Sequence, residues 1–151
     1  MKDIDLFIEN WAGESAMVPI SHQDIIELEA QLQVALPQAY KYLLTTYGLV
    51  RTPNVLTKTC DLNVEVANVQ DFLSVEDVLS LSKLYEMTGM PTGHIVFASD
   101  SEGNMFCFKK SECDLQLNDV PVWFYNQALC TVTQVAQGFV PWLIRFNTAH
   151  L

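Results

Sequence analysis

The stretch ISHQDIIELEAQLQVALPQAYKYLLTTYG, residues 20–48, decides the fold because it combines two short amphipathic helices with a tight corner between them. Ser21 followed by Asp24 resembles a capping box, in which a hydroxyl at the N-cap and a carboxylate three residues later open a helix, and Ser74 with Asp77 repeats the pattern further along the chain. Pro37 suits the first position of the second helix, where its missing N–H leaves no bond unmade. Gly48 suits the position just after that helix, which requires a positive φ.

Hydrophobic spacing predicts the other elements. Two apolar runs joined by a turn that contains Gly103 are typical of a β-hairpin. A third strand follows, and Pro121 near its start predicts an edge position or a bulge. Besides the two helices of residues 20–48, the expected elements are a helix over 3–11, a strand near 62–70, a helix from 74 to about 87, strands over 94–99, 104–110 and 120–126, and a C-terminal helix with Phe139, Trp142, Leu143 and Phe146 on one face and Pro141 in its first turn.

These elements predict one α+β domain over residues 1–151, in which a mostly antiparallel sheet of about four to six strands packs against helices from both chain ends. The chain carries 8 basic and 18 acidic side chains, a formal net charge of −10. A nucleic-acid binder needs a basic surface for phosphates, and an anionic membrane surface would repel this protein. We therefore expect neither partner.

The four cysteines form no Cys-x-x-Cys pair and have no close histidine, so we expect no metal site and no cofactor. The N-terminal residues 1–14 lack the apolar core of a signal peptide, and no apolar run approaches the ~20 residues of a membrane span. The expected location is the cytoplasm, with reduced thiols. Oligomeric state does not follow from these features.

The order of motifs along the chain is that of one superfamily. They are Leu28-Glu29, Leu36-Pro37, Tyr40, Tyr47-Gly48, a glycine-centred turn over 100–104 with the strand 105–108, the Pro-Val strand 121–125, and Phe139, Trp142 and Leu143. Over residues 20–147 this set resembles the SUKH superfamily, which joins fungal cell-wall-synthesis regulators and many bacterial immunity proteins. Many relatives carry an acidic or His-Glu pair after the Pro-Val strand, where this chain has Asn126-Gln127. The positions to which we assign a structural role are Leu36, Pro37, Tyr40, Gly48 and Gly103.

The resemblance implies a non-enzymatic protein that neutralises a cognate polymorphic or contact-dependent toxin, often a nuclease, by binding it tightly. The alternative within the superfamily is a regulatory scaffold or adaptor of the cell-wall type. A small-ligand binder or an enzyme is a third class. The sequence has none of the common catalytic motifs, and a spatial pair of Cys107 with His94 is the remaining nucleophile candidate.

The partner of such a protein would be a basic toxin domain, so exposed carboxylates are the first candidates for its binding surface. Aromatic side chains on one face of a strand are the second, because buried aromatic anchors dominate many interfaces. The alternatives are that the acidity serves solubility only and that the aromatic side chains belong to the core. The partner-binding candidates are Asp61, Glu65, Asp100, Glu102, Trp123 and Tyr125.

Overall fold

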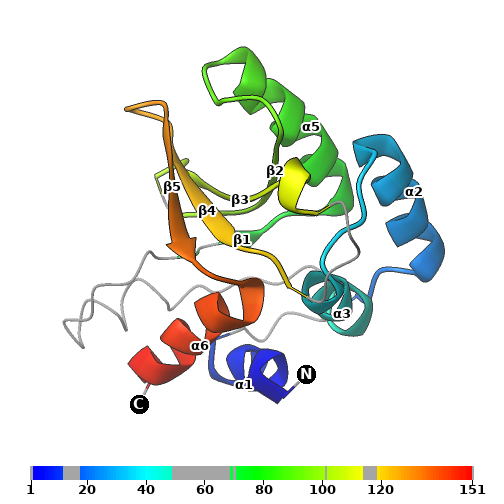
Figure 1. The fold of residues 1–151 in the computed structure, drawn as a ribbon. Helices are drawn as coiled ribbons and strands as arrows, with labels where there is room; N and C mark the ends of the chain where they lie inside the picture. The colour runs from blue at the N-terminus through cyan, green and yellow to red at the C-terminus, as the bar shows by residue number, and fades with distance from the viewer. Residues whose placement is uncertain are drawn as a thin grey trace.

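The structure is a computed structural model that describes residues 2–11, 18–48, 69, 71–100, 102–113 and 119–150, with side chains described as far as Phe146 (Figure 1). The elements are α1 (Lys2–Trp11), α2 (His22–Leu32), α3 (Gln38–Thr46), β1 (Asp71–Phe72), α5 (Val75–Met87), β2 (His94–Ser99), β3 (Met105–Lys109), the 3-10 helix η1 (Lys110–Glu112), β4 (Val122–Asn126), β5 (Thr131–Ala136) and α6 (Phe139–His150). The α+β fold class is therefore confirmed.

The strands form one five-stranded antiparallel sheet in the order β1-β2-β3-β4-β5. The predicted hairpin is β2–β3. Of the two alternatives predicted from Pro121, the edge position is wrong, because β4 lies between β3 and β5, whereas the bulge agrees with an irregularity at the start of β4. Pro121 precedes the first paired residue, Val122, so the ladder needs no N–H from it, and the register shifts between Val122 and Trp123. The predicted strand near 62–70 lies outside the described residues, apart from the buried Val69.

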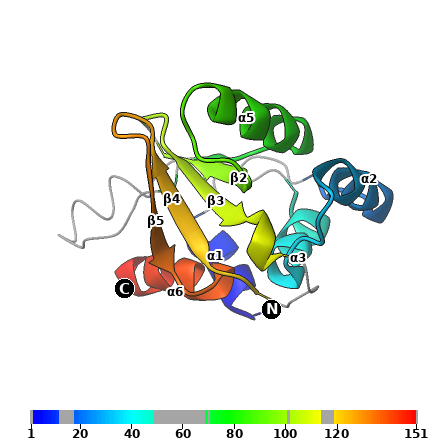
Figure 2. The same ribbon diagram turned by 45° about the horizontal axis from the view of Figure 1, so that its top comes forward.

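Aromatic side chains fill the layer between the sheet and the helices α1, α3 and α6. Phe97 of β2 and Phe108 of β3 stack with ring centroids 4.2 Å apart, and Tyr40 of α3 packs against both rings. Trp142 of α6 completes the layer against Phe97. Figure 2 shows α1 and α6 together on this side of the sheet, with α5 on the other side. The two ends of the described chain thus cover one face, as the sequence predicts.

Helix α5 covers the opposite face of the sheet and is tied to β2 at a bulge. The β2–β3 register shifts between Val96 and Ala98, and the Val96 N–H donates instead to the Ser82 hydroxyl of α5 at 3.1 Å. A buried N–H without an acceptor would destabilise the fold, so this contact fixes α5 against the sheet. Helix α2 lies outermost, beside α5 (Figure 1).

Two predicted helix caps are present. The Ser21 hydroxyl accepts the Asp24 N–H at 3.1 Å and the Ser74 hydroxyl accepts the Asp77 N–H at 3.2 Å. These caps define where α2 and α5 begin, and both N-terminal ends lie on the same side of the molecule as the cleft described below.

Candidate functional site

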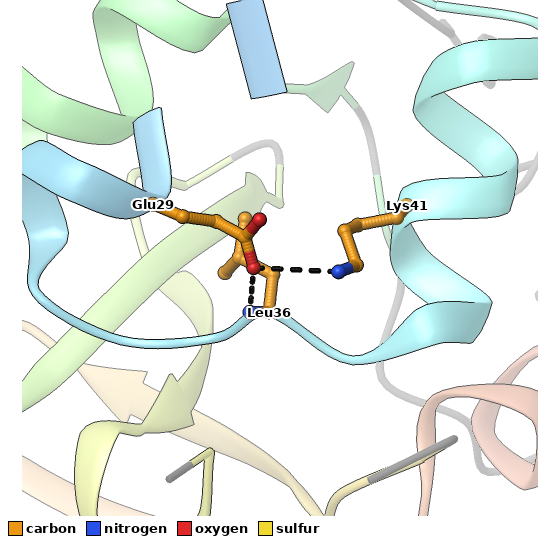
Figure 3. Close-up of polar contacts among 3 residues, drawn as sticks. All are labelled: Glu29, Leu36 and Lys41. Carbon is orange, nitrogen blue, oxygen red and sulfur yellow. Dashed lines mark hydrogen bonds and ion pairs between the residues drawn. The ribbon is translucent and has the colours of Figure 1, made fainter. Parts of the chain in front are cut away.

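The corner between α2 and α3 depends on one carboxylate. Glu29 Oε2 accepts the backbone N–H of Leu36 at 2.7 Å and lies 3.4 Å from the ammonium of Lys41 (Figure 3). Leu36 and Tyr40 are buried in the aromatic core. Glu29 is therefore engaged inside the protein, and the motif it belongs to holds two helices rather than offering a free carboxylate.

The turn between β2 and β3 contains two of the predicted partner-binding residues. Asp100 is committed to the turn itself, because its carboxylate accepts the N–H groups of Glu102 and Asn104 and the side-chain amide of Asn104, all within 2.8 to 2.9 Å. Glu102 is exposed, and only its backbone hydrogen-bonds to the described residues around the turn. Of these two residues, only Glu102 presents a carboxylate with no role in the turn.

The residues at the Asn126-Gln127 position lock this turn to the β4–β5 connection. Gln127 donates its backbone N–H to the Asn104 side chain at 3.0 Å and its side-chain amide to the Glu102 carbonyl at 2.9 Å. Asn126 accepts the N–H groups of the two residues that follow Gln127. Gly103 has φ +84°, and a Cβ there would meet the Gln127 amide. These polar residues thus order two adjacent turns.

Trp123 is half-buried on β4, and the protein already contacts its ring. Its Nε1–H donates to Glu112 at 2.8 Å, and the Lys109 ammonium lies 3.5 Å from the ring centroid. Tyr125, by contrast, is only 1 % exposed and packs edge-to-face against Tyr85 of α5, so it cannot serve as an exposed anchor. The structure removes Tyr125 from the candidate surface because α5 covers that end of the strand.

The two remaining predicted carboxylates, Asp61 and Glu65, lie outside the described residues. Glu102 and Trp123 do not line any of the recesses between the described helices and strands reported below. The predicted partner-binding residues therefore do not form a single site among the described residues.

A recess that the sequence interpretation missed lies between α2 and α5. It has a volume of about 380 Å³, within the range of ~300–1,000 Å³ typical of ligand-accepting clefts. Its apolar lining includes Ile20, Leu28, Val75 and Leu79. Val18, at its rim, is 71 % exposed. We call this recess the α2–α5 cleft.

The α2–α5 cleft is acidic. Asp24 and Glu27 of α2 and Glu76 of α5 line it and are all exposed, and none of the described residues that line it is a lysine, arginine or histidine. Asp24 and Glu76 lie in the first turns of their helices, where the helix dipole favours a carboxylate. Spacing alone could have indicated these acidic first turns, but only the packing of α2 beside α5 shows that they face one recess.

The candidate nucleophile lies in an unfavourable environment. Burial raises the pKa of the Cys107 thiol to about 12, although the nearby Lys109 charge lowers it slightly, so the reactive thiolate is scarce at neutral pH. Its Sγ lies 3.6 Å from the Trp123 carbonyl. In the part of the chain that the structure describes, no three His, Cys, Asp or Glu residues are placed to hold a metal ion, and no helix is long and apolar enough to cross a membrane.

Comparison with known proteins agrees with this architecture. The model of the SMI1 / KNR4 family (SUKH-1) matches residues 19–145. The chain belongs to this SUKH family. A protein from Pseudomonas syringae pv. tomato with a known crystal structure has a similar fold, with a TM-score of 0.58 over 93 % of this chain and 92 % of that one, at 15 % sequence identity. At this identity the likeness shows the fold alone. No curated protein matches the chain at a significant level.

Membership of the SUKH family accounts for the elements that the match spans, from the residues before α2 into α6. The Glu29–Leu36 corner and the glycine-centred turn of β2–β3 lie within it. Apart from Val18, the residues that line the acidic α2–α5 cleft also lie within the matched range.

Proposed function

We propose that this SUKH protein is a non-enzymatic binding protein of the immunity type, which neutralises a basic toxin domain by tight protein–protein binding. Its acidity supports this proposal, since a net charge of −10 attracts a basic partner and repels nucleic acid. A toxin that acts on nucleic acid needs basic groups for phosphates. Carboxylates that pair with those groups would occupy them and exclude the substrate.

The observation that carries the proposal is the α2–α5 cleft. Three exposed carboxylates surround an apolar floor, and within the part of the chain that the structure describes no basic side chain lines it. This combination suits an interface in which apolar contacts hold the partner and charges guide its approach. Glu102, in the turn after β2, and Trp123, on β4, do not line this cleft, so we assign the contact to the cleft and not to them.

The test uses the purified chain and the purified product of the gene that lies next to its own. We expect a stable complex, inhibition of the partner's toxic activity, and association that slows severalfold as salt rises, because exposed charges interact over only ~8 Å at physiological ionic strength. A regulatory scaffold would bind a partner without any toxic activity. If the chain itself turned over a substrate, and changing Cys107 or His94 abolished that turnover, the binding-protein assignment would be wrong.

A further inference from the structure

The α2–α5 cleft continues toward the C-terminal ends of the two helices. A second, smaller hollow of about 50 Å³ lies there, and both Gln31 and Leu79 line the two recesses. Early residues of both helices line the large recess, and later residues of both line the small one. The two helices therefore run in the same direction, with the two recesses following one another along them, and we call this face the α2–α5 groove.

The charge of the α2–α5 groove changes sign along its length. The large end carries Asp24, Glu27 and Glu76, whereas the small end carries Lys83 and Lys110. The groove thus has one strongly acidic end and one end where lysines are present. The three carboxylates lie on α2 and in the first turn of α5, whereas Lys83 lies in a later turn of α5 and Lys110 begins η1.

Glu86 and His94 also line the small end, and both are accounted for. The Glu86 carboxylate accepts the Gly93 N–H at 3.0 Å, which holds it against the turn after α5. His94 is buried, with its Nδ1 3.0 Å from the Pro91 carbonyl. Over the described lining residues, and with histidine counted as neutral, the three carboxylates give the large end a charge of −3, and two lysines and one glutamate give the small end +1.

We propose that the α2–α5 groove binds one amphipathic helix of a protein partner, whose lysines and arginines lie only at the end over Asp24, Glu27 and Glu76. The other end of the partner's helix, which lies over Lys83 and Lys110, is uncharged or acidic. This inference rests on the proposed function and adds to it the kind of segment recognised and its orientation.

The shape and chemistry of the groove favour such a helix. Two helices that lie side by side with an apolar floor between them form the groove into which a third helix can lay its apolar face. The stems of lysine and arginine side chains can cover the apolar rim near Val18 while their charged ends reach the carboxylates. A phosphate-bearing ligand would be repelled by the large end.

The test compares two synthetic amphipathic helical peptides with the same apolar face. One has lysines only in its first turn, and the other has lysines in its first and last turns. General attraction to a protein of charge −10 would make the second peptide the tighter ligand. The groove predicts the opposite, because Lys83 and Lys110 repel the second peptide's last turn. Fluorescence anisotropy gives both dissociation constants, and we expect the first to be severalfold smaller.

Two variants of equal charge locate the binding. Glu27→Gln/Glu76→Gln should weaken the first peptide severalfold, whereas Glu9→Gln/Glu102→Gln, which removes two exposed carboxylates elsewhere, should leave it within about twofold. A spin label beside the peptide's lysines should broaden the amide signals of Asp24 and Glu76 more than that of Lys83. Tighter binding of the second peptide, or equal effects of the two variants, would overturn the inference. If the neighbouring gene's product still binds and is inhibited, the proposed function survives that failure.

Discussion

The carboxylate of Glu29 accepts the backbone N–H of Leu36, seven positions further along the chain, in a hydrogen bond of 2.7 Å (Figure 3). The Glu29 carbonyl also accepts the Val34 N–H at 3.3 Å. One residue thus closes the connection between α2 and α3 through both its main chain and its side chain. The ion pair with Lys41 is part-buried and adds less, since such pairs near the surface contribute about 0–1 kcal/mol.

Replacing Glu29 should therefore destabilise the fold through a lost acceptor more than through a lost charge. Glu29→Ala leaves the Leu36 N–H without its partner, and we expect the free energy of unfolding to fall by about 1–3 kcal/mol. Glu29→Gln keeps an oxygen acceptor and should lose less. Urea unfolding measures both, with Glu27→Ala on the exposed face of α2 as the control, expected to change stability by less than ~0.5 kcal/mol. Equal losses for the alanine and glutamine variants would show that the ion pair dominates.

The glycine that ends α3 is required by a close backbone approach as well as by its conformation. Gly48 has φ +82°, its N–H donates to the Leu43 carbonyl at 3.1 Å, and an added Cβ would overlap the Val18 carbonyl. Gly93 has nearly the same φ, +85°, but an added Cβ there meets nothing within 4 Å. The pair separates conformational strain from steric overlap.

Gly48→Ala should consequently destabilise the protein more than Gly93→Ala. Both variants strain a left-handed residue by roughly 1 kcal/mol, and Gly48→Ala adds an overlap that costs a further ~1–3 kcal/mol. Thermal unfolding of the two variants side by side provides the measurement. If they lose the same stability, the contact between residue 48 and Val18 is not required by the fold.

A carboxylate of α1 is bound by two tyrosines of the α2–α3 region. Asp5 Oδ1 accepts the hydroxyl hydrogens of Tyr47 and Tyr42 at 2.5 and 2.8 Å. These two hydrogen bonds lower the pKa of Asp5 below its ordinary value of 3.8. Burial, followed by the Asp5 contact, raises the pKa of Tyr47 to about 12. Because the pKa of Asp5 is lower in the folded than in the unfolded state, its ionised form stabilises the fold at pH values above the unfolded-state pKa. This stabilisation is lost as the pH falls through the folded-state pKa.

The stability difference between the wild type and Asp5→Asn should therefore depend on pH. We expect it to be constant from pH 7 down to about 5 and to shrink below about pH 4, as Asp5 becomes protonated in the unfolded and then the folded state. Urea unfolding at a series of pH values gives the curve. As a control, the same comparison is made in the Tyr42→Phe/Tyr47→Phe variant, which lacks both donors to Asp5. There the stability difference caused by Asp5→Asn should depend little on pH. A difference that grows in acid would contradict the assignment.

Local patterns in the sequence predicted what local chemistry controls. Ser21 and Ser74 signalled their helix starts, and the apolar runs of β2 and β3 signalled their hairpin, because caps and alternation act over a few residues. β5 was missed, since Thr131 to Ala136 mixes exposed threonine and glutamine with half-buried valine and shows no strong alternation. Its strand identity comes from pairing with β4.

Contacts between distant residues could not be predicted in this way. Asp119 accepts the N–H groups of Phe139 and Val140 and so caps α6 from twenty residues away, a contact that no local pattern indicates. The burial of Tyr125 depends on where α5 packs. The acidic α2–α5 cleft likewise exists only because α2 and α5 pack side by side, so that Glu27 and Glu76, far apart in the sequence, line one recess. The site therefore required the structure, whereas the family resemblance did not.

The central claim is that the acidic α2–α5 cleft is the binding face, and association kinetics test it most directly. Surface plasmon resonance gives the on-rate of the neighbouring gene's product with the wild type, Glu27→Gln/Glu76→Gln and Glu9→Gln/Glu102→Gln, at low and physiological salt. Both double variants change the net charge equally, so only position distinguishes them. We predict that the cleft pair lowers the on-rate severalfold and the other pair changes it by less than about twofold. Equal effects, or a larger effect from the pair that contains Glu102, would contradict the claim.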